Sequence, residues 1–234
     1  MVLTGDSQIW MWVPAIADWA SRNNWRVEVY AKGSCPPWPD KYQLWFDHSA
    51  YPQCAHYQKF TESQINLQRP AVVIAAGLRP VWPRSYCFNC DPKATMGALR
   101  DDVQSFARAI STSGARVFFL QPSPTFNAFG STVRVPPYCL TRETSDIRLC
   151  TNTSDDELRD YWWSLAFTPE SIPVGTTMIV QNQLLCAKNK CPMVVGSTLV
   201  YADQDHVSLQ WAEFVSQGFG QILAPLVDKF RHHT

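Results

Sequence analysis

A serine near the start of the chain and an Asp-x-x-His pair near its end are the residues best suited to chemistry. Ser7 ends a Gly-Asp-Ser sequence, and His206 has Asp203 three residues before it. A serine hydroxyl is a weak nucleophile at neutral pH, so it needs a base within hydrogen-bond reach and a third group that orients the base. These residues predict a catalytic site with Ser7 as nucleophile, His206 as general base and Asp203 as the orienting carboxylate.

Other interpretations of these residues remain open at this point. Asp205 competes with Asp203 for the orienting role, although a residue adjacent to His206 more easily points away from it. Ser7 could serve only as a helix N-cap, a position that serine fills well. The chain holds four further histidines, two in a long central loop and two in the terminal tail: His48, His56, His232 and His233.

Ser7 stands where a predicted first strand, residues 2–4, turns into a helix. A helix N-terminus carries unpaired N–H groups and partial positive charge, so backbone donors there, including the amide of the nucleophile, can stabilise an oxyanion. Apolar residues at three- and four-residue steps predict that helix, and Pro14 marks either a kink or a separate first turn.

Strand and helix signals alternate along the rest of the chain. The run 71–77 is continuously apolar and ends in glycine, which is typical of a central parallel strand covered on both faces. This alternation predicts an α/β fold, a three-layer α/β/α sandwich with a central parallel sheet, in one domain spanning 1–234. The expected elements are strands at 25–31, 116–120, 176–180 and 193–201, and helices at 96–113, from 154 and at 207–227, with a long aromatic loop up to about residue 60.

Composition excludes several classes of protein. Twenty basic and twenty acidic residues leave no net charge, which disfavours a general electrostatic grip on nucleic acid or anionic membrane. No apolar run approaches the roughly 20 residues of a membrane-spanning helix. The sequence implies no metal or organic cofactor.

Eight cysteines, most of them in polar, Pro-rich stretches, favour disulfides and an oxidising, extracytoplasmic setting. The simplest hypothesis pairs neighbours in sequence, although eight cysteines allow about 105 connectivities. An alternative is a zinc site made of Cys87, Cys90, Cys186 and Cys191. The predicted pairs are Cys35–Cys54, Cys87–Cys90, Cys139–Cys150 and Cys186–Cys191.

The chain opens directly on a predicted core strand, without a signal peptide. We therefore expect a domain excised from a larger membrane-anchored protein that carries its export signal upstream.

Four motifs together resemble a known family. Gly-Asp-Ser at the first strand end and Asp-x-x-His near the C-terminus are similar to the SGNH (GDSL-type) hydrolase superfamily. More narrowly, the chain resembles the extracytoplasmic SGNH domain fused to acyltransferase-3 membrane proteins, which O-acylate cell-envelope glycans in bacteria. The motifs that carry this resemblance are Leu3-Thr-Gly-Asp-Ser7, Gly33-Ser-Cys-Pro-Pro37, Leu185-Cys186 with Cys191-Pro192, and Tyr201-Ala-Asp-Gln-Asp-His-Val-Ser208.

The resemblance implies a role for each matching residue. Ser7 would accept the acyl group, His206 would act as base and then acid, and Asp203 would orient it. Gly33 matches the family's second-block glycine, whose amide joins that of Ser7 in the oxyanion hole.

The sequence departs from the family pattern at three positions. Gln8 stands where many fused domains have histidine, and Val207 replaces the commoner leucine. Where free-standing members have Gly-x-Asn-Asp, this chain has Gly77-Leu-Arg79-Pro, so either the Arg79 guanidinium replaces the missing asparagine donor or the hole holds two backbone donors only.

The resemblance further implies the setting of the reaction. It predicts a serine-dependent O-acyltransferase or acetylesterase, extracytoplasmic and tethered to the membrane in its parent protein, that receives its acyl donor from a membrane acyltransferase-3 domain and acts on an envelope glycan or glycolipid. We expect a monomer. The alternative is a catalytically silent glycan-binding or docking module. The aromatic stretch from Trp38 to Tyr57, with Trp82, would then form a platform for sugar rings, or it simply packs its own aromatics.

Overall fold

The computed structural model describes most of the chain. The described residues are 1–39, 50–77, 92–124, 139–141, 146–153, 175–188, 190–203 and 205–233, and the side chains of 92–99, 153 and 231–233 are not described. No helix in these ranges is both long enough and apolar enough to cross a membrane.

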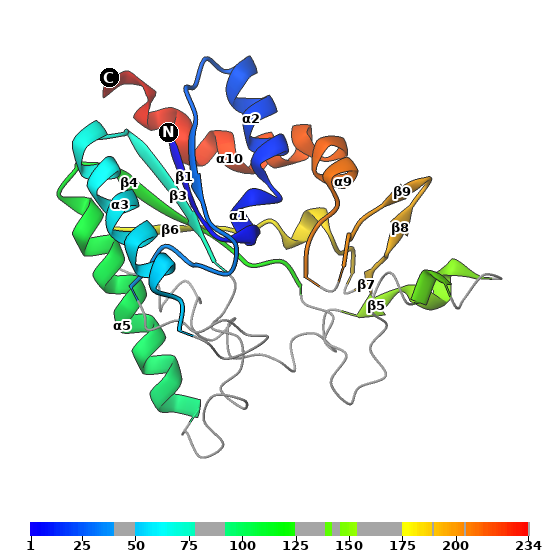
Figure 1. Cartoon of the computed structure of the whole chain (residues 1–234). Helices are drawn as coiled ribbons and strands as arrows, with labels where there is room; N and C mark the ends of the chain where they lie inside the picture. The colour runs from blue at the N-terminus through cyan, green and yellow to red at the C-terminus, as the bar shows by residue number, and fades with distance from the viewer. Residues whose placement is uncertain are drawn as a thin grey trace.

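Five parallel strands form the central sheet (Figure 1). They lie in the order β2-β1-β3-β4-β6, which is the flavodoxin-like strand order and changes direction between β1 and β3. The carboxyl ends of β1 and its neighbours therefore border the crevice where such sheets place their functional groups. The bounds are β1 Val2–Gly5, β2 Glu28–Ala31, β3 Val72–Ala76, β4 Arg116–Leu120 and β6 Thr177–Ile179.

Helices cover both faces of this sheet, as β3 shows. Ile74 packs in one apolar cluster with Trp19 and Leu223, whereas Val73 packs in a second cluster with Phe106 and Ile110. Successive strand residues point to opposite faces, so each face has its own core. This confirms the predicted three-layer α/β/α fold. The first layer holds α1 Ser7–Trp10, α2 Val13–Arg22, α9 Leu209–Phe214 and α10 Ser216–Val227, and the second holds α3 Pro52–Gln68 and α5 Pro92–Ser111.

Two predicted elements are wrong. The segment expected as a loop up to residue 60 contains α3, which begins at Pro52. The single strand expected at 193–201 is a hairpin of β8 Val194–Val195 and β9 Thr198–Leu199, which turns at Gly196 with a φ of 61° and stays outside the main sheet.

The remaining described elements are short. β5 Asn152–Thr153 pairs with β7 Lys190–Cys191, and short 3-10 helices lie at Ile147–Cys150, Asn182–Leu184 and Asp228–His233. The predicted helix from residue 154 lies outside the described residues.

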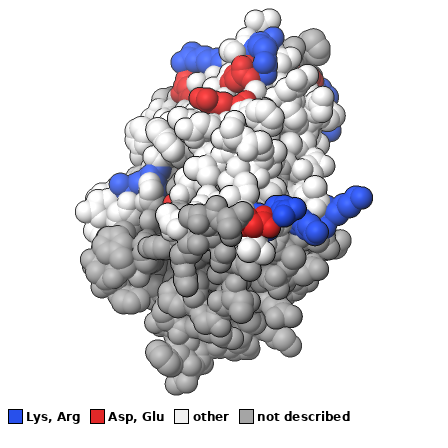
Figure 2. All heavy atoms as spheres, turned by 90° about the vertical axis from the view of Figure 1, so that its right-hand side faces the viewer, with Lys and Arg blue, Asp and Glu red and all other residues white. Residues whose placement is uncertain are grey.

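Among the described residues, the side that carries α9 and the β8–β9 hairpin has an uncharged area between two groups of charged side chains (Figure 2). Figure 2 shows a broad uncharged area on this side, above the part drawn in grey. The elements there expose apolar side chains, namely Val195, Leu199, Leu209 and Phe214.

Three of the four predicted disulfides are present. Cys35–Cys54, Cys139–Cys150 and Cys186–Cys191 are bonded. Because Cys186 and Cys191 bind each other, the alternative zinc site is wrong. Cys87 and Cys90 lie outside the described residues.

Gly5 is the last residue of β1, and its backbone requires glycine. Its φ is +148°, and a Cβ there would lie 1.8 Å from the carbonyl oxygen of Ala76 on β3. Because this neighbour is backbone in a buried strand, it has little freedom to move away. Packing thus requires the glycine of the Gly-Asp-Ser sequence, two residues before Ser7.

We predict that Gly5→Ala lowers the free energy of unfolding by about 3 kcal/mol, a fall in Tm of about 6 to 12 °C for a chain of this size. Thermal unfolding followed by circular dichroism measures the change. Gly33→Ala is the matched control, since a Cβ at Gly33 meets nothing within 4 Å. Equal stability of the two variants would contradict the steric argument.

Candidate active site

The first turn after β1 presents Ser7 at the carboxyl edge of the sheet. Asp6 is the N-cap of α1 and its side chain accepts a hydrogen bond from the amide of Gln8 at 2.8 Å. Ser7 itself is half-buried. Among the described residues, the Ser7 amide donates to no protein acceptor, so it is free to act as an oxyanion donor.

His206 and Asp203 form a close pair on one loop. His206 Nδ1 lies 2.8 Å from Asp203 Oδ2 and 2.9 Å from Oδ1. The backbone amides of Asp205 and His206 also donate to Asp203 Oδ1, at 3.0 and 2.9 Å. This arrangement places the proton on Nδ1 and leaves Nε2 as the ring nitrogen that can accept one.

The loop that carries this pair is closed at its base. Tyr201 and Val207 form an antiparallel bridge, and the amide of Ala202 donates to the carbonyl of His206 at 2.8 Å. Ser208 then caps α9 by accepting from the amide of Trp211. His206 therefore lies on a closed loop between the β8–β9 hairpin and α9.

The charges around His206 favour its protonated form. The hydrogen bond to Asp203 raises the pKa of His206, partial burial opposes that shift, and Asp205, Asp203 and Asp6 add to it. Burial acts against ionisation of Asp203, yet the hydrogen bonds from His206 and the two loop amides hold its pKa well below the usual range. Asp203 thus stays ionised and stabilises an imidazolium.

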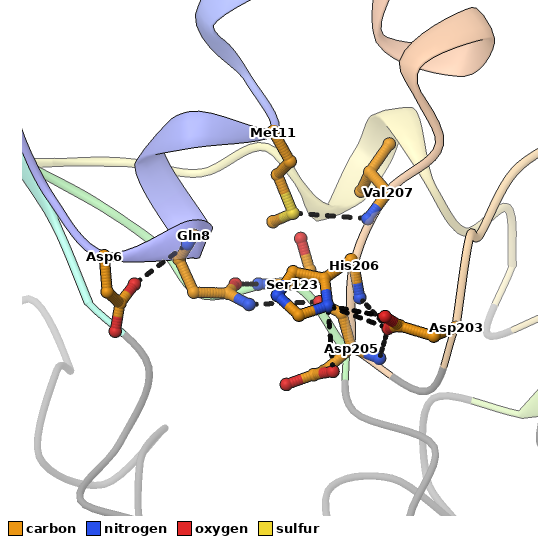
Figure 3. A network of polar contacts seen from close by, with 8 residues as sticks. All are labelled: Asp6, Gln8, Met11, Ser123, Asp203, Asp205, His206 and Val207. Atoms are coloured by element: carbon orange, nitrogen blue, oxygen red, sulfur yellow. Dashed lines mark hydrogen bonds and ion pairs between the residues drawn. The ribbon is translucent and has the colours of Figure 1, made fainter. Parts of the chain in front are cut away.

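Asp205 is the weaker partner of His206. Its Oδ1 lies 3.3 Å from Nδ1, against 2.8 Å for Asp203. The side chain of Asp205 is 9% exposed and that of Asp203 49% exposed, so the second carboxylate approaches the ring from the buried side. Figure 3 shows both carboxylates beside His206. One side-chain oxygen or nitrogen atom from each of these three residues lies within 4.8 Å of the other two, a proximity that their polar contacts explain.

Gln8 joins α1 to the His206 loop, and sequence reasoning missed this role. The side chain is 1% exposed; its Nε2 donates to the carbonyl of Asp205 at 3.0 Å, and its Oε1 accepts from the amide of Ser123 at 3.0 Å. Figure 3 shows the amide between the two segments. The departure from the family's histidine was the only sequence signal at this position.

Met11 supplies a second contact between the two ends of the chain. Its sulfur accepts from the amide of Val207 at 3.2 Å, and both residues are buried. The residues on either side of His206 are therefore bonded to the short helix that begins at Ser7. The loop that carries Asp203 and His206 therefore lies beside the segment that follows Ser7, while no hydrogen bond joins Ser7 to His206 among the described residues.

Gly33 lies in the turn after β2, next to β1. Ala31 pairs with Gly5, and the amide of Lys32 donates to the carbonyl of Gly5 at 2.9 Å. Gly33 is exposed, and within the described ranges its amide donates to no protein acceptor. The second predicted oxyanion donor is thus available at the same edge of the sheet as Ser7.

The first half of α3 holds this turn in place. Tyr51, which precedes the helix, donates to the carbonyl of Gly33 at 3.1 Å, and Cys54 is bonded to Cys35. Gln58 Nε2 lies 3.0 Å from the carbonyl oxygen of Pro36 and 2.6 Å from that of Trp38. The helix missed by sequence reasoning therefore supports the Gly33 turn.

Tyr57 of α3 ties the ends of β1 and β2 together. Its hydroxyl accepts from the amide of Gly5 at 3.0 Å and lies 2.6 Å from the carbonyl oxygen of Tyr30. Burial raises the pKa of this phenol, so it remains a neutral hydrogen-bonding group. Tyr57 is a structural contact directly before the Gly-Asp-Ser turn.

The predicted aromatic platform and the predicted Arg79 donor can be compared with the structure only in part. Trp38 is 1% exposed and packs against Phe119 with ring centroids 6.5 Å apart, so for this residue the packing interpretation holds and the sugar platform does not. Arg79 and Trp82 lie outside the described residues, as do His48 and the aromatic residues between 40 and 49.

A family model, the SGNH domain (fused to AT3 domains), matches residues 1–221. The chain belongs to this family. The predicted family is thereby confirmed. No curated protein sequence matches the chain.

Solved structures of this fold are similar to the SGNH domain. The periplasmic domain of a lipopolysaccharide acetyltransferase from Salmonella ser. Paratyphi A matches with a TM-score of 0.65 at 15% identity, over 95% of this chain and 82% of that one. A GDSL-like lipase from Bacteroides thetaiotaomicron VPI-5482 matches with a TM-score of 0.45 at 13% identity, over 97% and 87%. An acetyl xylan esterase matches with a TM-score of 0.48 at 10% identity, over 97% and 98%. The likeness to the first concerns the fold.

We predict that Gln8→Ala destabilises the domain by about 2 kcal/mol, because it leaves a buried carbonyl and a buried amide without partners. Loosening the His206 loop should also lower kcat for ester substrates about tenfold or more with little change in KM, since the ground-state contacts remain. Chemical unfolding and steady-state kinetics measure the two effects.

Gln181→Ala is the matched control for this experiment. Gln181 is also buried, and its amide nitrogen donates to the carbonyl of Gln121. It should lose stability and keep its kcat. If Gln8→Ala also kept kcat, the hydrogen bonds of Gln8 to Asp205 and Ser123 would have a structural role only.

We predict that the pKa of His206 lies above the ordinary value of 6.5 and falls in Asp203→Asn. Removing the anion destabilises the imidazolium, so the proton leaves at lower pH. NMR titration of the ring measures this directly. Asp205→Asn should produce a smaller fall because its oxygen lies farther from Nδ1; a larger fall would make Asp205 the main partner.

Proposed function

We propose that the SGNH domain is a serine-dependent O-acyltransferase or acetylesterase that forms an acyl-enzyme on Ser7. The observation that carries this proposal is the Asp203–His206 pair at 2.8 Å, on a loop bonded through Gln8 and Met11 to the helix that Ser7 begins. Membership of a family fused to AT3 domains supports the same class of chemistry.

The first half-reaction transfers the acyl group to the enzyme. His206 Nε2 takes the hydroxyl proton of Ser7 as Oγ bonds to the acyl carbon, giving a tetrahedral oxyanion. The amides of Ser7 and Gly33 donate to this oxyanion, and Arg79 is a further candidate donor. When the bond to the leaving group breaks, His206 returns the proton to that group, leaving an ester on Ser7.

The second half-reaction releases the acyl group. A hydroxyl of the acceptor gives its proton to His206 Nε2 while its oxygen attacks the acyl carbon; the bond to Ser7 Oγ then breaks and Oγ regains the proton. An envelope glycan or glycolipid as acceptor makes the domain a transferase, and water makes it an esterase. One triad serves both outcomes, which differ in whether the acceptor excludes water.

The setting follows from the family and the disulfides. Three cystines in the described part of the chain favour an oxidising compartment, and the fusion to AT3 domains favours a membrane partner that delivers the acyl group. We therefore propose an extracytoplasmic domain, tethered to the membrane in its parent protein, which acts on the cell envelope. The single-domain organisation over 1–234 and the monomeric state stay predictions.

We predict that Ser7→Ala lowers hydrolysis of p-nitrophenyl acetate at least about 10³-fold, since it removes the nucleophile of the proposed mechanism. Release of p-nitrophenol measures the rate, and peptide mass spectrometry after fluorophosphonate treatment should place the label on Ser7. Ser21→Ala is the matched control, because Ser21 is an exposed serine on α2. Equal rates for wild type and Ser7→Ala would instead support the catalytically silent glycan-binding module.

A further inference from the structure

Trp10 is an exposed tryptophan one helical turn after Ser7. Its exposed fraction is 63%, whereas Gln8 and Ile9 between the two residues are buried. The amide of Trp10 donates to the carbonyl of Asp6 at 3.2 Å and that of Met11 to the carbonyl of Ser7 at 3.0 Å, so this segment is a regular turn. Residues three apart on such a turn share a face, with Cβ atoms about 5–6 Å apart.

The direction of a helical side chain brings the indole closer still to the nucleophile. Helical side chains lean toward the N-terminus and cover the preceding turn, which for Trp10 is the turn that begins at Ser7. The bond between Met11 and Val207 places α1 beside the start of α9, where Leu209 is also exposed, at 58%. This helix geometry favours an aromatic face that borders the nucleophile on the solvent side.

We propose that Trp10 forms a subsite for the pyranose ring of the acyl acceptor, stacking on the ring while one of its hydroxyls attacks the acyl group on Ser7. This inference rests on the proposed function and adds the residue that holds the sugar. It moves the sugar-stacking role from the buried Trp38 to Trp10, which belongs to the same helix as the nucleophile.

The exposure of Trp10 favours a sugar over an acyl chain. A hydrocarbon chain binds best where it is enclosed and loses most of its contact with water. A pyranose ring has one apolar C–H face and hydroxyls around its edge, so it can cover an open aromatic face while the hydroxyls stay hydrated. Trp10 offers such an open face.

The binding test uses NMR of the indole N–H groups of the Ser7→Ala protein. The Trp10 resonance is assigned by its loss in Trp10→Phe, and methyl α-D-glucopyranoside, methyl α-D-galactopyranoside and methyl α-L-rhamnopyranoside are the probes. At least one glycoside should shift the Trp10 signal in a saturable way, while sodium acetate and 1-propanol should not. Because Ser7 is absent from this protein, the result does not depend on its reactivity.

The transfer test uses p-nitrophenyl acetate as donor and the same glycosides as acceptors. The ratio of acetylated glycoside to free acetate, measured by mass spectrometry, should fall at least about tenfold in Trp10→Ala, remain near wild type in Trp10→Phe, and remain unchanged in Phe60→Ala. Phe60 is the matched control, an exposed aromatic residue on α3, 53% exposed.

Two outcomes would overturn the subsite. They are an unmoved Trp10 signal with every glycoside, and a transfer ratio that Trp10→Ala leaves at the wild-type value. Failure of the proposed function would look different, since donor hydrolysis would then be equal in wild type and Ser7→Ala. A Trp10 signal that moved with acetate or propanol and not with the glycosides would assign the residue to the acyl group instead.

Discussion

The bond between α1 and the His206 loop is the constraint on which the proposed chemistry depends. Gln8 and Asp205 are 197 positions apart, so only tertiary contacts bring Ser7 and His206 to the same edge. A buried amide that loses one partner costs about 1–3 kcal/mol, and Gln8 uses both ends of its amide, toward Asp205 and toward Ser123. The two chain ends are therefore held by groups that cannot separate without leaving buried polar atoms unpaired. Met11 adds an independent contact to Val207, so the loop is held on both sides of His206.

A second constraint comes from the sheet itself. β1 lies between β2 and β3, and the turns that follow β1 and β2 start from the paired residues Gly5 and Ala31. These turns contain too few residues to form a core of their own. Tyr51, directly before α3, supports them together with the disulfide Cys35–Cys54 and Tyr57 of α3. Loops rarely satisfy their own backbone groups, and here side chains of one helix satisfy several of them. The donors proposed for the oxyanion are thus fixed before a substrate arrives, which is what electrostatic stabilisation of a transition state requires.

Sequence patterns predicted the features that depend on neighbouring residues. The apolar runs predicted the bounds of β3 and β4 nearly to the residue. The contact between Asp203 and His206 is made within a local turn, which the Asp-x-x-His spacing can form by itself. α3 escaped prediction because its buried positions include Cys54, Gln58 and Thr61, so it shows no apolar stripe. The β8–β9 hairpin escaped because Gly196 turns an apolar run that reads as one strand. The role of Gln8 was beyond local reasoning, since both of its partners are distant in sequence. For Trp38 the sequence left two interpretations open, because an aromatic residue in a Pro-rich segment gives no sign of its burial.

The four residues of α1 serve two purposes, since one side of the helix anchors it to the fold and the other side faces solvent. Gln8 and Ile9 are buried and join the helix to the fold, while Ser7 and Trp10 remain accessible. An exposed indole removes little apolar area from water, so it contributes little to stability through the hydrophobic effect, and packing of α1 does not require it. A helix this short has only these two positions open to solvent. One of these positions holds the proposed nucleophile, Ser7. The large aromatic ring at the other position, Trp10, is therefore better explained by contact with the acyl acceptor than by a contribution to folding.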